Sequence, residues 1–178
     1  MPEQTDIVRG ALASQIADAT CAAMAPFVEV RSLSKGEPLI REDWGTDVLY
    51  TVMDGSLEVV LEEPEGRMLV GQIGRGTFVG EASFLDQGAP TATVRATTAC
   101  RLLTLRRADF EKLCVAHPKA GADLIRALCV VLAKRVNNSA SGLLEQVSEE
   151  TFNLRQPEVR TGPFAQLLAR LSGGRHRG

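Results

Sequence analysis

The chain has 178 residues, a net charge of −2 and a hydrophobic content of 44%. This composition is typical of one globular domain with an appendage, and the charge gives no general case for nucleic-acid binding. No apolar run reaches the ~18 residues of a membrane-spanning helix, and the N-terminus lacks a signal-peptide pattern. The four cysteines are scattered, so we expect buried, reduced thiols in a cytoplasmic protein and no metal site.

Residues 1–26 are predicted to form an N-terminal helix. Apolar side chains recur through an alanine-rich segment between residues 5 and 25, and Pro26 would end the helix. We expect this helix to pack against the domain that follows it, residues 27–150.

The segment from Phe27 to Arg106 has the pattern of β-strands. Short apolar runs are separated by Gly, Pro and Asp at short intervals, which is typical of an antiparallel roll or barrel. Asp54-Gly55 is the strongest hairpin signal in the chain. The predicted strands are Phe27–Leu33, Pro38–Arg41, Val48–Met53, Ser56–Glu62, Arg67–Ile73, Ala92–Ala96 and Cys100–Leu105.

The segment Phe78–Val94 is rich in turn signals and could bind a small ligand. Gly80 can adopt a positive φ angle, and Glu81 places a carboxylate at the mouth of the turn. A short apolar helix, Ala82–Leu85, is predicted to follow, and a Gly-Ala-Pro sequence ends it. The first backbone N–H groups of that helix, at Ala82 and Ser83, would have no partner within it and could hold an anion.

This segment resembles the phosphate-binding cassette of the cyclic nucleotide-binding domain family. That cassette reads Gly-Glu, a short apolar helix, Pro-Arg, a small residue, Ala, a small residue and Val; Gly80, Glu81, Thr91, Ala92 and Val94 are in register with it. The resemblance implies an α+β fold, with an eight-stranded antiparallel β-roll of jelly-roll-like topology between an N-terminal helix and a long C-terminal helix. It also implies that Glu81 accepts a hydrogen bond from a ribose 2′-hydroxyl and that Thr91 helps to hold the cyclic phosphate.

The sequence departs from the family pattern at Pro90, which stands where the family has the arginine that pairs with the phosphate. Proline has no charge and no N–H donor. The loss of a hydrogen bond to a charged group costs about 1.5–3 kcal/mol, which is more than tenfold in affinity. Arg75 and Arg95 are near in sequence, but strand alternation directs Arg95 with Thr93 and opposite to Val94, so Arg95 is not an obvious substitute.

Two helices are predicted after the strands. Arg107–Ala116 is the first, and we interpret His117 as a helix-end residue and not as a catalyst. The second, from Pro118 to about Glu150, has apolar residues at spacings of three and four over a belt broad enough to need cover on more than one side.

The resemblance implies that this long helix lies over the ligand and forms a homodimer through Pro118–Glu150. Asn138 or Ser139 would then hydrogen-bond a purine edge. The alternative is that this polar stretch is only a kinked, solvated part of the helix.

Residues 151–178 form a basic tail, with five arginines against one glutamate, and a short amphipathic helix is predicted at Phe164–Leu171. The tail is too short and too rich in Gly and Pro for a helix-turn-helix domain, so we expect no direct DNA binding. The amphipathic helix would dock on its own domain, on a dimer mate, in a groove of a partner protein or on an anionic surface.

The sequence therefore favours a stand-alone regulatory sensor module that binds a nucleotide-like ligand and signals to a partner protein. Cyclic AMP, cyclic GMP and cyclic dinucleotides are the candidate ligands. The alternative is a degenerate, ligand-free dimerisation or scaffold module that presents the tail. We predict no catalytic residue and no cofactor, because the two histidines are far apart and no nucleophile lies beside a base. The predicted ligand-binding residues are Gly80, Glu81, Ala82, Ser83, Thr91, Ala92 and Ser139.

Overall fold

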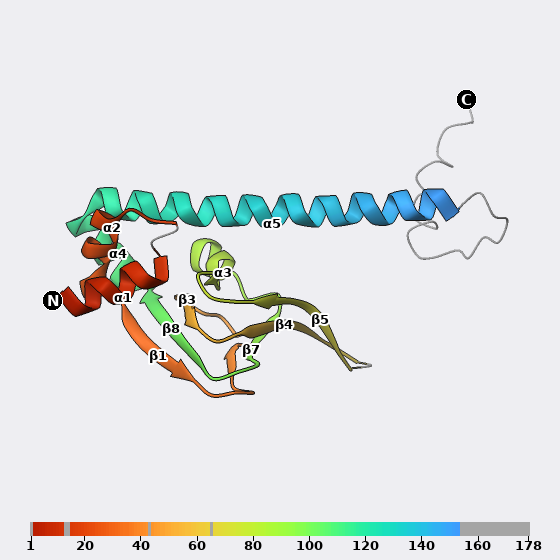
Figure 1. Ribbon diagram of the computed structural model, residues 1–178, viewed down its shortest axis with the longest axis horizontal. Helices are drawn as coiled ribbons and strands as arrows, with labels where there is room; N and C mark the ends of the chain where they lie inside the picture. The colour runs from red at the N-terminus through yellow and green to blue at the C-terminus, as the bar shows by residue number, and fades with distance from the viewer. Residues whose placement is uncertain (1, 13–14, 43, 65, 154–178) are drawn as a thin grey trace, which may run out of the picture. The chain divides into compact units, whose positions relative to one another are not determined.

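The computed structural model describes residues 2–12, 15–42, 44–64 and 66–153, and Figure 1 shows their helices and strands. The chain divides into two units, Met1–Leu132 and Ala133–Gly178. The first unit holds eight antiparallel strands in two sheets together with helices at both of its ends. This is the α+β fold that the resemblance implied.

The N-terminal segment is not the single helix that was predicted within residues 1–26. It contains two helices, α1 (Pro2–Leu12) and α2 (Asp18–Met24), and a 3-10 turn, η1 (Ala25–Phe27). The carbonyl of Leu12 accepts hydrogen bonds from the amides of Gln15 and Ile16 where the chain changes direction. Both helices place buried side chains in one hydrophobic core, Val8 and Leu12 from α1 and Cys21 and Met24 from α2.

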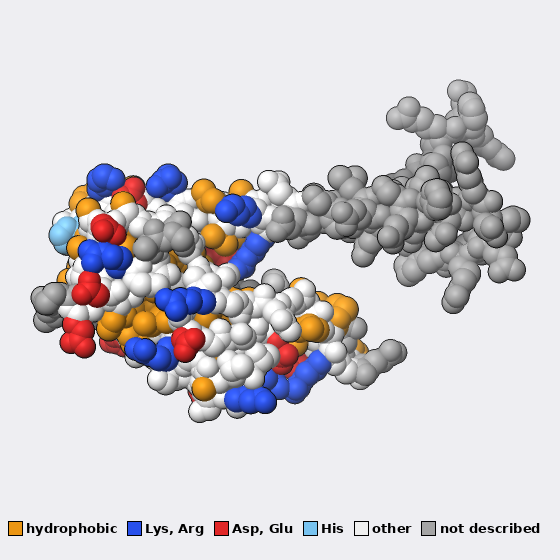
Figure 2. Space-filling model, viewed as in Figure 1, with side chains coloured by type: hydrophobic (Ala, Val, Ile, Leu, Met, Phe, Trp, Pro, Cys, Tyr) orange, Lys and Arg blue, Asp and Glu red, His pale blue; other side chains and the backbone are white. Residues whose placement is uncertain are grey.

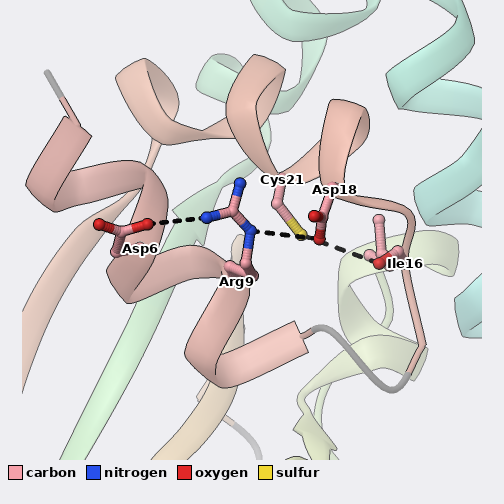
Figure 3. Close-up of polar contacts among 5 residues, drawn as sticks. All are labelled: Asp6, Arg9, Ile16, Asp18 and Cys21. Atoms are coloured by element: carbon pink, nitrogen blue, oxygen red, sulfur yellow. Dashed lines mark hydrogen bonds and ion pairs between the residues drawn. The ribbon is translucent and has the colours of Figure 1, made fainter.

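Arg9 joins these two helices across the turn (Figure 3). Its guanidinium lies 2.8 Å from the carboxylate of Asp6 in α1 and 3.2 Å from that of Asp18 in α2. The Cys21 thiol is buried beside this contact and lies 3.9 Å from the carbonyl of Ile16. Burial, and then the negative charge of Asp18, raise the pKa of this thiol, so it stays protonated at neutral pH.

The strands form two four-stranded sheets, ordered β1-β8-β3-β6 and β2-β7-β4-β5. The chain crosses from one sheet to the other at every connection except the β4–β5 hairpin, as in a jelly roll. The strand bounds are β1 (Glu29–Leu33), β2 (Pro38–Ile40), β3 (Val48–Asp54), β4 (Leu57–Glu63), β5 (Gly66–Ile73), β6 (Phe78–Val79), β7 (Thr93–Ala96) and β8 (Cys100–Arg106).

The hairpin predicted at Asp54-Gly55 is wrong, because β3 and β4 belong to different sheets and do not pair. The turn itself is present, with Gly55 at φ 90°. It is held from outside by the segment before β8: the amide of Ser56 donates to Thr98 Oγ1 at 3.0 Å, and the Ser56 carbonyl accepts from the amide of Thr97 at 2.9 Å. The turn therefore passes the chain between sheets.

Strands β3 and β8 of the first sheet are buried on both of their faces, whereas the edge strand β1 is mostly exposed. One face packs against α1, α2 and the helices that follow β8, through side chains such as Leu103 and Leu105. The other face packs against the second sheet, through side chains such as Leu102 and Val52. Alternate residues of the same strand thus enter two separate hydrophobic cores.

The two helices predicted after the strands are confirmed as α4 (Arg107–Ala116) and α5 (Pro118–Asn153). His117 lies at the end of α4, where its amide donates to the Leu113 carbonyl at 2.7 Å, as expected of a helix-end residue. None of the described helices combines the length and hydropathy that a membrane-spanning segment needs. All four cysteines are free thiols; Cys21 and Cys100 are buried as predicted, whereas Cys129 is exposed.

The visible face of the described residues carries acidic and basic side chains in a mixed arrangement (Figure 2). Strand β5, an edge strand of the second sheet, instead exposes apolar side chains. Its residues Met68, Leu69 and Val70 are exposed at 48%, 56% and 56%. Three consecutive exposed apolar residues on a free sheet edge are unusual, because such an edge can pair with another chain.

The first prediction concerns Gly55. A Cβ atom there would lie 2.6 Å from Cys100 Sγ and would collide with the carbonyl of Ala99, and the φ angle is left-handed. We expect Gly55→Ala to lower the free energy of unfolding by about 1–3 kcal/mol. Thermal unfolding should show a Tm about 2–4 °C lower for each kcal/mol. The matched control is Gly45→Ala, where nothing lies within 4 Å; equal melting of both variants would contradict this account.

The second prediction concerns the carboxylate of Asp123, which ties α5 to α2. Lys119 Nζ donates to it at 2.9 Å and Thr20 Oγ1 at 2.7 Å, and these hydrogen bonds lower its pKa from the ordinary 3.8. A lowered pKa stabilises the fold above the unfolded value, and this contribution is lost as pH falls below about 3.8. Asp123→Asn should therefore reduce Tm at neutral pH.

The difference in Tm between wild type and Asp123→Asn should shrink as the pH falls below 3.8. Thermal melts at a series of pH values check this expectation. Glu111→Gln, which alters an exposed carboxylate on α4, provides the control and should change little at any pH. A difference that stays constant across the series would show that the Asp123 carboxylate contributes by packing and not by its charge.

Candidate ligand-binding site

The predicted cassette connects the two sheets. It leaves the first sheet at the end of β6, at Val79, and enters the second at the start of β7, at Thr93. Between them lies the short helix α3 (Glu81–Asp86), which contains the predicted Ala82–Leu85 and one further residue at each end. The cassette is therefore fixed at both ends by strands that belong to different sheets.

Position 80 requires glycine because the backbone has a positive φ angle there and because neighbouring atoms leave little room for a side chain. It is the residue before α3 and has φ 81°. A Cβ atom at this position would lie 3.0 Å from the Val48 carbonyl oxygen and 3.2 Å from Ile40 Cδ1. The turn thus brings the start of α3 close to strands of both sheets, which a larger residue would prevent.

The next three residues alternate between covered and open positions. Glu81 and Ser83 are each only 4% exposed, whereas Ala82 between them is exposed. A carboxylate so well covered is unusual and needs polar partners. Its place in the first turn of a helix is favourable for a negative charge.

The second half of the cassette differs from what the family pattern would place there. Pro90, at the position of the family's arginine, is buried. Thr91 is exposed and Ala92 is half-buried. The neighbouring Thr93 is buried, and its hydroxyl oxygen accepts a hydrogen bond from the amide of Glu42 at 3.2 Å. An apolar ring thus occupies the place at which the family has a charge.

Among the described residues a different cation, Arg107, contacts the cassette, and it was not predicted from the sequence. Its guanidinium donates to the Ser83 carbonyl at 3.0 Å and lies 5.2 Å from the centre of the Phe84 ring. The Phe84 ring in turn packs edge-on against Phe110 at 5.5 Å. Arg107 begins α4, so these contacts couple α3 to α4. No sequence signal separates Arg107 from its neighbour Arg106, because the contact is purely tertiary.

Arg75 and Arg95, the two arginines near the cassette in sequence, have other contacts. The Arg75 guanidinium is 3.4 Å from the Gly10 carbonyl in α1. Arg95 lines a cavity together with Thr93, whereas Val94 between them is buried in the core between the sheets, so the predicted alternation is confirmed. Ser139 lies on α5, and its side chain is outside the described part of the structure, so its role stays a prediction.

The model of the cyclic nucleotide-binding domain family matches residues 30–117, which include all eight strands apart from the first residue of β1 and also include α3 and α4. Residues 30–117 belong to the cyclic nucleotide-binding domain family. The matched region contains the cassette with its positive-φ Gly80 and its covered Glu81.

Sequence and structure comparisons agree with this assignment. The chain is 30% identical over 136 residues to the cAMP-activated global transcriptional regulator CRP of Escherichia coli O6:H1, a match that covers 75% of the chain and 59% of that relative. The chain thus spans less than two thirds of the curated relative. A cyclic nucleotide-binding domain from Methylobacillus flagellatus superposes with a TM-score of 0.69 at 22% identity, over 82% of this chain and 83% of that one.

A second solved structure, the N-terminal domain of a transcriptional regulator from Streptomyces coelicolor, has a TM-score of 0.62 and 28% identity. It covers 73% of this chain and 94% of that domain. The cyclic nucleotide-binding fold is therefore supported by sequence and by three-dimensional similarity.

The third prediction tests whether Arg107 holds the cassette. We expect Arg107→Ala to destabilise α3 locally by about 1 kcal/mol, because the Ser83 carbonyl loses a charged donor at a partly exposed site. The amides of Phe84 and Gln87, which close α3, should then exchange with deuterium roughly fivefold faster. Arg106→Ala is the matched control, since Arg106 is exposed and lies one residue earlier. Unchanged exchange in Arg107→Ala would refute the coupling.

Proposed function

We propose that the chain is a regulatory sensor module that binds a cyclic nucleotide or a related nucleotide-like ligand and signals to a partner protein. The observation that carries the proposal is the Gly80-Glu81 turn, which has the left-handed glycine and the covered carboxylate at the start of α3. The membership of residues 30–117 in the cyclic nucleotide-binding domain family supports it. A relative named as cAMP-activated points to the same class of ligand.

In this proposal Glu81 accepts a hydrogen bond from a sugar hydroxyl, and the main chain at Ala82 and Ser83 together with Thr91 and Ala92 surrounds the phosphate. A carboxylate can recognise a sugar hydroxyl by accepting a hydrogen bond from it, and main-chain N–H groups can hold an anion without a charged side chain. Because Pro90 supplies no guanidinium, the affinity for a cyclic phosphate should be more than tenfold below that of a site with the arginine.

The signal would pass from α3 to α4 through the contacts of Arg107 and Phe84. A ligand changes a protein's conformation only by binding one arrangement more tightly than another. Contacts with the ligand at Glu81 would bias the position of α3, and α4 would follow. A homodimer through Pro118–Glu150 belongs to this proposal, and the exposure of Val130 and Val136 on α5 supports it, since apolar side chains on a long helix commonly pack against a second helix. No enzymatic activity is expected.

The fourth prediction tests the ligand. Isothermal titration calorimetry of the full chain with cyclic AMP, cyclic GMP and cyclic dinucleotides should show binding to at least one of them. Glu81→Gln should weaken that binding at least about tenfold, because an amide is a poorer acceptor for the sugar hydroxyl. Glu29→Gln, on exposed β1, is the control and should bind as wild type does. Absence of heat with every nucleotide would overturn the proposal.

A second candidate function is a ligand-free dimerisation or scaffold module. One observation favours it: Pro90 is buried at the position of the missing arginine. This candidate predicts a chain that is dimeric without any nucleotide and that binds none. The same titrations distinguish the two functions, since only a sensor gives ligand heat that depends on Glu81. Light scattering on the unliganded chain tests the dimer that both functions include.

A further inference from the structure

A cavity of about 500 Å³ lies on the outer face of the second sheet. Thr93 and Arg95 of β7 line it, while Val94 and Ala96 of the same strand point into the core between the sheets. The cavity is therefore on the side of β7 that faces away from that core. It is separate from the Gly80–Ser83 turn. Its lining residues are Pro38, Arg41, Glu42, Glu62, Thr93 and Arg95.

Two polar atoms of this lining are buried and have no hydrogen-bond partner among the residues that the structure describes: Glu42 Oε2 and Arg95 Nε. Buried polar atoms in folded proteins are almost always satisfied, and exceptions call for a specific explanation. Glu42 Oε2 is a hydrogen-bond acceptor and Arg95 Nε is a hydrogen-bond donor, and both residues line the same cavity. A ligand that donates to Glu42 and accepts from Arg95 would satisfy both.

A backbone hydrogen bond holds Glu42 in place. The amide of Glu42 donates to the hydroxyl of Thr93 at 3.2 Å, so the residue is anchored to β7 next to Arg95. Glu62, the other acid, is already engaged by Arg67 at 3.1 Å and lies 3.9 Å from Arg95. Glu42 is thus the carboxylate that remains available to a ligand.

A second cation, Arg41, lines the cavity. Arg41 makes no ion pair with any residue in the described ranges; its guanidinium lies over the ring of Trp44 at 5.6 Å. Arg41 and Arg95 together offer a carboxylate the planar donors that suit it. The four described charged side chains of the lining are two arginines and two glutamates, and Arg67 pairs with one of these glutamates, Glu62. Arg41, Arg95 and Glu42 then remain, a set that suits a ligand with both a carboxylate and an ammonium group.

We propose that this cavity binds a small zwitterion, a free α-amino acid, at a place distinct from the Gly80-Glu81 turn of the cassette. The carboxylate of the amino acid accepts hydrogen bonds from Arg95 Nε and the Arg41 guanidinium. Its ammonium group donates to Glu42 Oε2. The volume leaves room for a side chain of moderate size.

Trp44 gives a direct readout, because it is the single tryptophan of the chain and stacks on Arg41. The full chain is titrated with each of the common L-amino acids, followed by Trp44 fluorescence and by calorimetry. Acetate, methylammonium and inorganic phosphate serve as comparison probes, because they carry only one of the two charges. We expect saturable binding of at least one amino acid and markedly weaker binding of all three comparison probes.

Two variants test the assignment of the charges. Glu42→Gln and Arg95→Gln should each weaken amino-acid binding at least about tenfold, because each removes a charged partner from the ligand. Glu29→Gln and Arg101→Gln change exposed charges on the first sheet and should bind as wild type does. Melting curves identify any variant that fails to fold. If Arg95→Gln does not fold, the result with Glu42→Gln alone tests the proposal.

Three results would overturn the proposal. The first is that no amino acid binds the folded wild-type chain, in which case the cavity holds only water. The second is that acetate or phosphate binds as tightly as the best amino acid, which would make it a simple anion site. The third is that both variants bind as wild type does. The cyclic-nucleotide titrations with Glu81→Gln fail or succeed independently of these outcomes.

Discussion

The burial of strands β3 and β8 on both faces is the constraint on which the rest of the structure depends. Strands β3 and β8 send alternate side chains into two cores, so that Leu102 meets the second sheet and Leu103 meets the helices. A strand with two covered faces cannot shift its register by one residue without moving every side chain into the wrong core. This fixed sheet gives the cassette a rigid support, because β6 pairs with β3 at the sheet edge and delivers Gly80 against the Val48 carbonyl.

The same support explains how the cassette can differ from the family pattern at one position and keep its shape. The conformation of Gly80 and the start of α3 follow from packing against Ile40 and Val48, and neither contact involves Pro90. Arg107 and Phe84 then hold the other side of α3 on α4. A site whose frame is set by hydrophobic packing and main-chain contacts can lose a ligand-binding side chain without collapsing, which is why fold and ligand affinity can change separately.

Much of the fold could be predicted because its signals are local. Alternation and turn residues located the strands, and the bounds of α4 follow directly from its amphipathic pattern and from Pro118. The errors occurred where distant contacts decide. No Gly or Pro interrupts residues 13–17, so nothing local separates α1 from α2. A turn such as Asp54-Gly55 specifies a change of direction but not which strand pairs with the next one. The contact of Arg107 with Ser83 depends on how α4 packs and has no signature in sequence.

The two proposed sites share one structural element, strand β7. The cassette runs through Thr91 and Ala92 into β7, and the outer cavity uses Thr93 and Arg95 of that strand. A ligand in the cassette or in the outer cavity that prefers one position of β7 would change the affinity of the other site for its ligand. Linkage then requires the effect to be equal in both directions, so an amino acid that strengthens nucleotide binding must itself bind more tightly when the nucleotide is present. The sheet pairing of β7 with β2 and β4 limits such movement to small shifts, which favours modest coupling over a large switch.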